Sequence, residues 1–183
     1  MRRWFALAAI GRDRPGIVAD LAELIYECDC NLEDSSMTRL GPEFAVLLLL
    51  SGEGGDLERR LSVGLKRLEW ESRLTVFFRP LDGEPPAAPA DDGTRTMECV
   101  VTGIDKAGIV ARVARALAQR GVNITALHTQ TRPGAESGAP IFTMRVRMEV
   151  PEPVPVDVLR ADLDRVAADL MVDATLADRS RDT

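Results

Sequence analysis

Gly11-Arg-Asp-Arg-Pro-Gly-Ile-Val18 and Gly103-Ile-Asp-Lys-Ala-Gly-Ile-Val110 are two copies of one pattern, 92 residues apart. Each copy follows an apolar run and opens a stretch in which apolar residues recur at helical spacing. Eight identities fall within 21 aligned positions that begin at the first glycine. This repeat predicts that the chain contains the same folding unit twice.

The sequence around the first copy predicts a strand, a helix, two strands, a helix and a strand. The expected strands cover 4–10, 32–40, 44–50 and 74–79. The expected helices begin after Gly16 and after Asp56. Asp13 and Asp56 each stand where a carboxylate caps the start of a helix. Because 32–40 is rich in polar residues, we expect this strand at an edge of the sheet.

The same series follows the second copy. Its strands are expected over 97–102, 122–131, 141–150 and 171–177, and its helices over 109–120 and 158–170. Between the two series, 82–95 contains three prolines and four acidic residues without periodicity, which is typical of a linker. We therefore predict domains over 1–81 and 96–179 and a tail over 180–183. The order βαββαβ predicts an α+β fold with two ferredoxin-like units.

The two predicted sheets differ on the face that the helices leave free. In the first sheet the central strands are apolar on both faces, as in buried strands, so we expect another surface to cover the face with Trp4, Ala6, Ala8 and Ile10. In the second sheet polar residues alternate outward, among them Glu98 and Arg145, so we expect that face to meet water.

Composition argues against several classes of protein. The net charge is −6 and the isoelectric point is near 4.9, so we expect no direct binding of nucleic acid. The longest apolar stretch, 44–50, is too short to cross a membrane. Cys28, Cys30 and Cys99 lack the spacing of a metal site or a redox pair, so we predict no metal and no cofactor. The N-terminus has no signal-peptide pattern, and we expect a cytoplasmic protein.

The repeated motif resembles the ACT domain. The first copy has Gly-x-Asp-x-Pro-Gly-Ile-Val after a strand and Asn31 at the opening of the next strand, whereas the second has Ala107 where Pro15 stands. Two ACT domains with nothing else are similar to the glycine cleavage system transcriptional repressor group. The resemblance implies a non-catalytic regulator that binds amino acids at interfaces between ACT units. It also implies that the protein acts through a partner transcription factor without contacting DNA itself. Because a βαββαβ sheet with one apolar face usually finds a partner, we also expect a homodimer.

An amino acid needs donors for its carboxylate and acceptors for its ammonium group. Backbone N–H groups at the start of a helix supply donors, glycine allows close approach, aspartate neutralises the ammonium, and asparagine can donate or accept. The candidate ligand-binding residues are Asp13, Arg14, Pro15, Gly16, Ile17 and Asn31, and Asp105, Lys106, Ala107, Gly108, Ile109 and Asn123. Equally, the aspartates could cap helices and the glycines and asparagines could serve only the turns. The sequence does not rank the two loops.

Other functions share the βαββαβ order. RNA-recognition domains need exposed aromatic residues on a basic sheet, and here Trp4 and Phe44 lack basic neighbours while Phe142 falls on the helix-covered side. Acylphosphatase-like enzymes also share it, but the sequence offers no nucleophile with a base and no two-metal set, so we expect no enzyme. An allosteric partner subunit of a metabolic enzyme is a further alternative.

Overall fold

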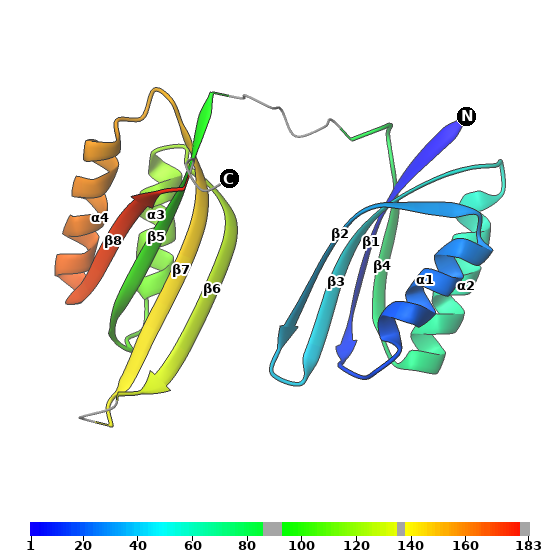
Figure 1. The fold of residues 1–183 in the computed structure, drawn as a ribbon, viewed down its shortest axis with the longest axis horizontal. Helices are drawn as coiled ribbons and strands as arrows, with labels where there is room; N and C mark the ends of the chain where they lie inside the picture. Colours follow the sequence, from blue (N-terminus) through cyan, green and yellow to red (C-terminus); the bar gives the residue numbers. More distant parts are fainter. Residues whose placement is uncertain (86–92, 135–137, 180–183) are drawn as a thin grey trace. The chain divides into compact units, whose positions relative to one another are not determined.

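The computed structural model describes residues 1–85, 93–134 and 138–179. The chain divides into two compact units, Met1–Ala88 (unit 1) and Pro89–Thr183 (unit 2). In each unit two helices lie on one face of a four-stranded antiparallel sheet (Figure 1). The prediction of two ferredoxin-like units with βαββαβ order is therefore confirmed.

The elements of the two units correspond one to one. Unit 1 contains β1 (Arg2–Arg12), α1 (Ile17–Glu27), β2 (Cys30–Leu40), β3 (Glu43–Glu53), α2 (Leu57–Ser72) and β4 (Thr75–Leu81). Unit 2 contains β5 (Thr94–Ile104), α3 (Ile109–Gln119), β6 (Asn123–Pro133), β7 (Pro140–Pro151), α4 (Val156–Leu170) and β8 (Val172–Asp178). The sheet orders are β2-β3-β1-β4 and β6-β7-β5-β8, so the polar strand β2 lies at an edge, as predicted.

The predicted linker, 82–95, overlaps the first two residues of β5. β5 begins at Thr94, so Thr94 and Arg95 belong to a strand. Residues 86–92 of the predicted linker lie outside the described residues. The same holds for 135–137 in the loop between β6 and β7 and for the predicted tail 180–183.

Each unit has its own apolar core between sheet and helices. In unit 1 the core includes the fully buried Phe5, Leu7, Leu50, Leu57 and Leu61. In unit 2 it includes the fully buried Cys99, Val101, Leu117, Met144 and Leu159. Burying one such aliphatic or aromatic side chain stabilises a fold by roughly 1.5–3 kcal/mol. The strict spacing of these residues along their strands and helices is what the periodicity predicted.

The starts of the helices differ from the prediction. The residue before α1 is Gly16 and not Asp13, and no side chain caps this helix. Asp56 does precede α2, but its carboxylate caps no backbone N–H. Instead it forms ion pairs with Arg59 at 3.7 Å and with Arg60 at 3.8 Å. The expectation that these two carboxylates cap helices is therefore wrong.

The helix-free face of the unit 1 sheet is apolar, as the sequence predicted. Ile10 of β1, Leu47 of β3 and Phe77 of β4 are 45%, 61% and 63% exposed on it. That another surface covers this face stays a prediction.

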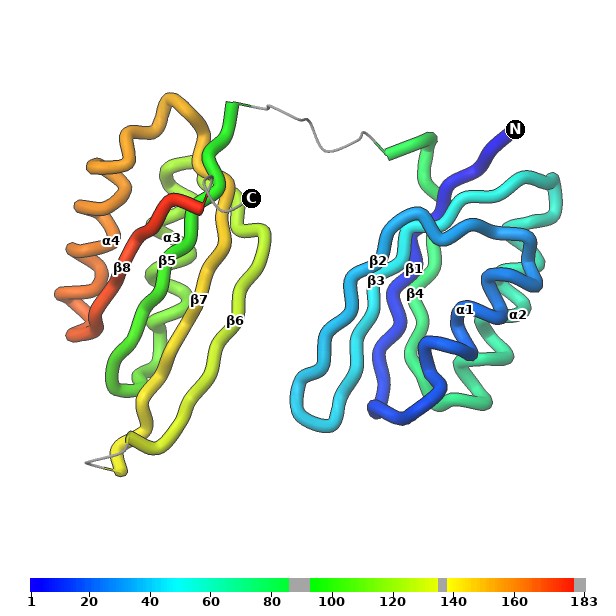
Figure 2. The backbone as a smooth tube through the Cα atoms, viewed as in Figure 1, coloured from blue at the N-terminus to red at the C-terminus, as the bar shows by residue number. Residues whose placement is uncertain are grey.

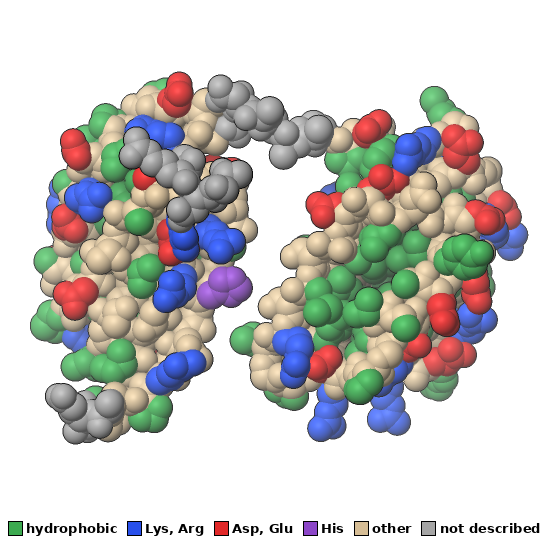
Figure 3. Space-filling model, in the orientation of Figure 1, with side chains coloured by type: hydrophobic (Ala, Val, Ile, Leu, Met, Phe, Trp, Pro, Cys, Tyr) green, Lys and Arg blue, Asp and Glu red, His purple; other side chains and the backbone are tan. Residues whose placement is uncertain are grey.

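The helix-free face of the unit 2 sheet carries charged side chains, and Figure 3 shows basic side chains beside the one histidine of the chain on unit 2. Glu98, which we expected to meet water, is only 9% exposed. Arg145, Arg147 and Arg179 surround its carboxylate at 3.9, 3.8 and 3.3 Å. The expectation is wrong for this residue because the long arginine side chains of the same face cover it. Within the described residues no helix has the length and apolarity to span a membrane.

Candidate functional site

The loop before α1 and the loop before α3 have the same backbone conformation. Gly16 has a φ angle of 95° and Gly108 a φ angle of 96°, both in the left-handed region. A residue with a Cβ atom pays a steric penalty there, so glycine is the residue that fits both turns. The turn directs the chain from the end of the central strand straight into the helix.

Both helices begin after a glycine, so no capping side chain accepts hydrogen bonds from their first N–H groups. The backbone hydrogen bonds of the helices start with Asp20 N to Gly16 O and Arg112 N to Gly108 O, each 2.9 Å long. The N–H groups of residues 17–19 and 109–111 therefore lie at the positive end of the helix dipole. Such an end of a helix can bind a small anion.

The aspartates of the two loops turn toward the neighbouring hairpin. Asp13 forms an ion pair with Arg39 of β2 at 2.7 Å. Asp105 accepts a hydrogen bond from Thr131 Oγ1 of β6 at 3.3 Å. Thr131 stands 92 residues after Arg39, so the two contacts are equivalent. Neither Arg39 nor Thr131 belongs to the repeated motif, so the motif does not predict these contacts. Only the 92-residue offset shows that the two residues occupy equivalent positions and differ in type.

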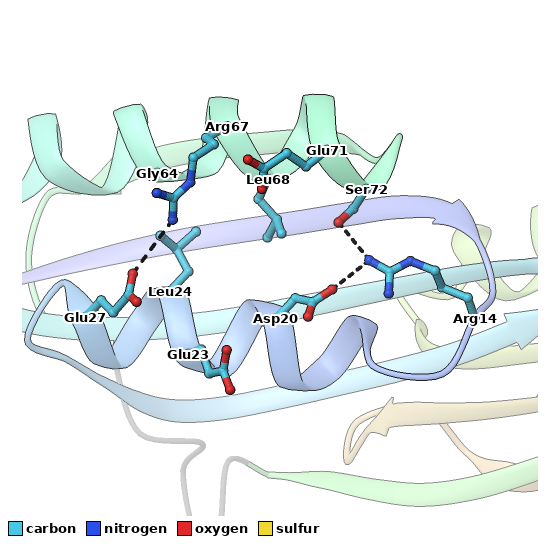
Figure 4. A pocket seen from close by; sticks show the side chains of 10 residues that line it. All are labelled: Arg14, Asp20, Glu23, Leu24, Glu27, Gly64, Arg67, Leu68, Glu71 and Ser72. Atoms are coloured by element: carbon cyan, nitrogen blue, oxygen red, sulfur yellow. Dashed lines mark hydrogen bonds and ion pairs between the residues drawn. The ribbon is translucent and has the colours of Figure 1, made fainter.

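The basic residues of the two loops hold the end of the second helix of their unit. Arg14 Nη2 donates to Ser72 Oγ at 2.8 Å and to Asp20 Oδ2 at 2.6 Å (Figure 4). Lys106 Nζ donates to Leu170 O at 3.4 Å. Ser72 and Leu170 are the last residues of α2 and α4. Because a helix C-terminus favours a cation, these contacts explain both side chains without a ligand.

A groove of about 310 Å³ lies between α1 and α2, with Arg14 at one end (Figure 4). Its charged lining is Arg14, Asp20, Glu23, Glu27, Arg67 and Glu71. Both arginines already form ion pairs with acidic residues, Arg14 with Asp20 and Arg67 with Glu27. The remaining carboxylates would repel the carboxylate of an amino acid, so this groove is not suited to one.

The two asparagines lie far from the loops of their own units. Asn31 pairs across the sheet with Ser51, which pairs with Trp4 near the start of β1. The loop follows Arg12 at the other end of that strand, eight residues or about 26 Å away (Figure 2). Asn123 sits in the same place in unit 2, where its Nδ2 donates to Glu149 Oε2 at 3.0 Å. One unit alone therefore does not bring loop and asparagine together.

The two loops differ in how much free polar surface they offer. Beside Gly16 the nearest atom to an added Cβ would be Arg14 Nη1 at 3.5 Å, whereas beside Gly108 nothing lies within 4 Å. Arg39 neutralises Asp13. Among the described residues no Lys or Arg side chain forms an ion pair with Asp105. The second loop is therefore the more open and the more acidic of the two.

The cysteines do not offer a nucleophile. All three are buried and unpaired. Burial raises the pKa of Cys30 to about 11 and that of Cys99 to about 11, so both remain thiols at neutral pH. Within the described ranges no group of His, Cys, Asp and Glu side chains could hold a metal ion.

Comparison with known proteins agrees with the repeat. Two family models, each of the ACT domain, match residues 5–79 and 98–164. The glycine cleavage system transcriptional repressor of Escherichia coli K12 is 27% identical over 151 residues, which are 82% of this chain and 76% of that protein. A solved structure of an unknown protein from Galdieria sulphuraria is 29% identical, has a TM-score of 0.77, and is matched over 97% of this chain and 99% of that one. The similarity thus extends over both units.

Proposed function

Since the chain belongs to the ACT-domain family, we propose that it is a non-catalytic regulatory protein that binds an amino acid at the loop between β5 and α3. The observation that carries this proposal is the uncapped start of α3 beside Asp105, a carboxylate without a cation partner among the described residues. An amino acid has the two opposite charges that these groups can accept. The loop of unit 1 supports the same ligand less well, because Arg39 neutralises Asp13.

The ligand carboxylate would accept hydrogen bonds from the N–H groups of 109–111, where the dipole of α3 favours a negative charge. The ligand ammonium would donate to Asp105 in place of Thr131 Oγ1. Gly108 leaves space for the ligand to come close to the backbone, since nothing lies within 4 Å of its Cβ position. A small amino acid such as glycine suits this shallow, polar place.

The loop is linked to the β6–β7 hairpin, which gives the ligand a way to alter another surface. The Asp105 side chain holds Thr131 of β6, and the Asp105 N–H donates to Pro140 O of β7 at 2.9 Å. A ligand that takes Asp105 away from Thr131 loosens one of these two links. We propose that a protein partner senses this change.

The partner that we propose is a transcription factor that controls amino-acid metabolism, and the first candidate is one that controls glycine metabolism. Support comes from the relative in Escherichia coli, which is a glycine cleavage system transcriptional repressor. In this proposal the chain works in the cytoplasm by protein contact and not on DNA. A metabolic enzyme with this chain as its allosteric subunit is the alternative partner.

Each of Asn31 and Asn123 lies about 26 Å from the loop of its own unit, so neither can contact a ligand at that loop, whereas a second copy of the chain could supply one of them. In such an assembly the asparagine of one copy would bind the ligand held by the loop of the other. Asn123→Ala would then weaken binding without altering the loop.

Isothermal titration of the full chain with the twenty amino acids, glycine first, tests the proposal. Asp105→Asn should raise the dissociation constant roughly 10- to 100-fold, because a charged hydrogen bond to the ammonium is lost. Asp13→Asn is the matched control and should have little effect. If no amino acid binds at millimolar concentration, or if both variants weaken binding equally, the proposal is wrong.

RNA binding has less support than amino-acid binding. The helix-free face of unit 2 does carry Arg145 and Arg147. However, Phe142 is only 8% exposed and belongs to the apolar core of unit 2, so it cannot stack on a base.

A further inference from the structure

On the helix-free face of the unit 1 sheet, each large side chain of one central strand pairs with a small one of the other. Leu47 and Leu49 of β3 lie on this face, and they pair across the sheet with Ala8 and Ala6 of β1. Leu47 is 61% exposed, although its strand is in the middle of the sheet. Toward the end of the strands the order is reversed, since Ile10 of β1 pairs with Ala45 of β3.

Each edge of the same face carries one charged residue at the same height. Asp34 of β2 pairs with Leu49, Leu49 with Ala6, and Ala6 with Arg79 of β4. Asp34 and Arg79 thus lie at opposite ends of a single row across the sheet. Asp34 Oδ1 accepts a hydrogen bond from the N–H of Ser35, and within the described residues neither charged side chain has an ion-pair partner.

We propose that a second copy of this chain packs its own unit 1 sheet face on this one, about a two-fold axis parallel to the strands. Such an axis places β3 over the partner's β1 and β2 over the partner's β4, and it keeps every row at its height. Leu49 then meets the partner's Ala6, and Asp34 meets the partner's Arg79. The symmetry repeats both contacts, so two apolar fits and two ion pairs form at once.

A two-fold axis perpendicular to the strands would not fit in this way. It places β3 over the partner's β3 and β1 over the partner's β1, so leucine faces leucine and alanine faces alanine. The first pairing overcrowds the interface and the second leaves voids, and both destabilise it. Two sheets that pack face to face keep their strands within about 30° of each other, which the parallel axis allows.

A groove on this face gives the second copy a further place to fit. The groove has a volume of about 280 Å³, and Ala6, Asp34, Ser36, Leu47 and Leu49 are among its lining residues. Because Ser36 and Phe77 belong to one row, the proposed axis sets the partner's Phe77 over Ser36. Phe77 is 63% exposed, and in the dimer its ring would fill the groove.

The area of this face indicates how tightly the two copies should associate. Four strands spaced about 4.8 Å and four rows about 6.6 Å apart cover roughly 500 Å² per copy. A pair of such faces buries about 1,000 Å² in total, which is below the roughly 1,200–2,000 Å² of standard stable interfaces and typical of weak association. We therefore expect a dimer with a dissociation constant in the micromolar range. The helix-free face of unit 2 is less suited to cover the unit 1 face, because such a contact would remove water from Arg145 and Arg147.

Sedimentation velocity of the full chain between about 1 and 100 µM tests the proposal without any amino acid, and so independently of the proposed function. Leu47→Arg should leave a monomer over this range. Val63→Arg is the control, since Val63 of α2 is 62% exposed and lies on the other side of unit 1. A wild-type chain that is monomeric at 100 µM overturns the proposal, and so does a dimer that Leu47→Arg leaves intact.

A charge exchange tests the axis itself. Asp34→Arg alone and Arg79→Asp alone each place like charges opposite each other, and each should raise the dimer dissociation constant about tenfold or more. An equimolar mixture of the two variants should dimerise again, because a chain with the Asp34→Arg change meets opposite charges at both rims when its partner has the Arg79→Asp change. Failure of the mixture to recover association overturns the two-fold arrangement, even where Leu47→Arg disrupts the dimer.

Discussion

The left-handed backbone at Gly16 permits a sharp test of why the loop motif ends in glycine. In Gly16→Ala the new Cβ atom would meet only Arg14 Nη1 at 3.5 Å, an ordinary contact, so the change acts on the backbone and not on packing. A residue with a Cβ atom in this conformation costs about 1–2 kcal/mol. Alanine also lowers the entropy of the unfolded chain, which returns about 0.4–1 kcal/mol.

Gly55 is the matched control in the same unit. Its Cβ position has nothing within 4 Å, and its φ is not in the left-handed region. Gly55→Ala should therefore gain the entropic stabilisation without the strain. The difference between the two variants then isolates the strain, and we expect it to be about 1–2 kcal/mol.

Tryptophan fluorescence in urea reports on unit 1 alone, because the two tryptophans of the chain are Trp4 and Trp70. Trp4 is 7% exposed and will respond to unfolding. With a slope of about 1 kcal/mol per molar urea, the midpoint of Gly16→Ala should lie about 1–2 M below that of Gly55→Ala. Equal midpoints would refute the argument that the turn before α1 requires glycine.

Three other predictions concern charge and burial. Arg39→Thr gives the first loop the partner that the second loop has, so titration of the full chain should show about two amino acids bound per chain in place of one; an unchanged stoichiometry would contradict the ranking of the loops. The pKa of Glu33 is lowered by a hydrogen bond from Ser51 and by Arg2, so this carboxylate stabilises unit 1 above pH 4.5 and the contribution is lost as the pH falls through its folded pKa. Urea midpoints from pH 6 to pH 3 should therefore fall less in Glu33→Gln than in the wild type, and parallel curves would count against it. Because Cys30 and Cys99 are buried thiols with pKa values of about 11, a thiol reagent at pH 8 should label them only after urea is added, and rapid labelling of the folded chain would show that they are accessible.

Local patterns in the sequence were sufficient for the fold. Strand and helix periodicity, glycine at the turns and the repeat itself are short-range signals, and they predicted the element order and the edge position of β2. The two cores follow from the same periodicity. The linker was less well predicted, since Thr94 and Arg95 have no apolar pattern but pair with β7.

The contacts of the loops could not be predicted in the same way. Asp13 stands near the start of a helix, and from the sequence a cap is the obvious role. Its actual partner, Arg39, comes 26 residues later and lies beside it only through the register of β2 on β3. The distance between loop and asparagine is likewise a matter of topology, because α1 carries the chain back along the sheet before β2 begins at Cys30, next to Asn31.

The main-chain hydrogen bond between each loop and its hairpin is compatible with hairpins of different length. The N–H of Asp13 donates to Pro42 O and that of Asp105 to Pro140 O, although the second hairpin is six residues longer. The anchor lies on the strand that follows the extra residues, so added length between the two strands leaves the anchor where it was. An insertion between β6 and β7, such as an epitope or a fluorescent label, should therefore leave this anchor and the neighbouring loop undisturbed.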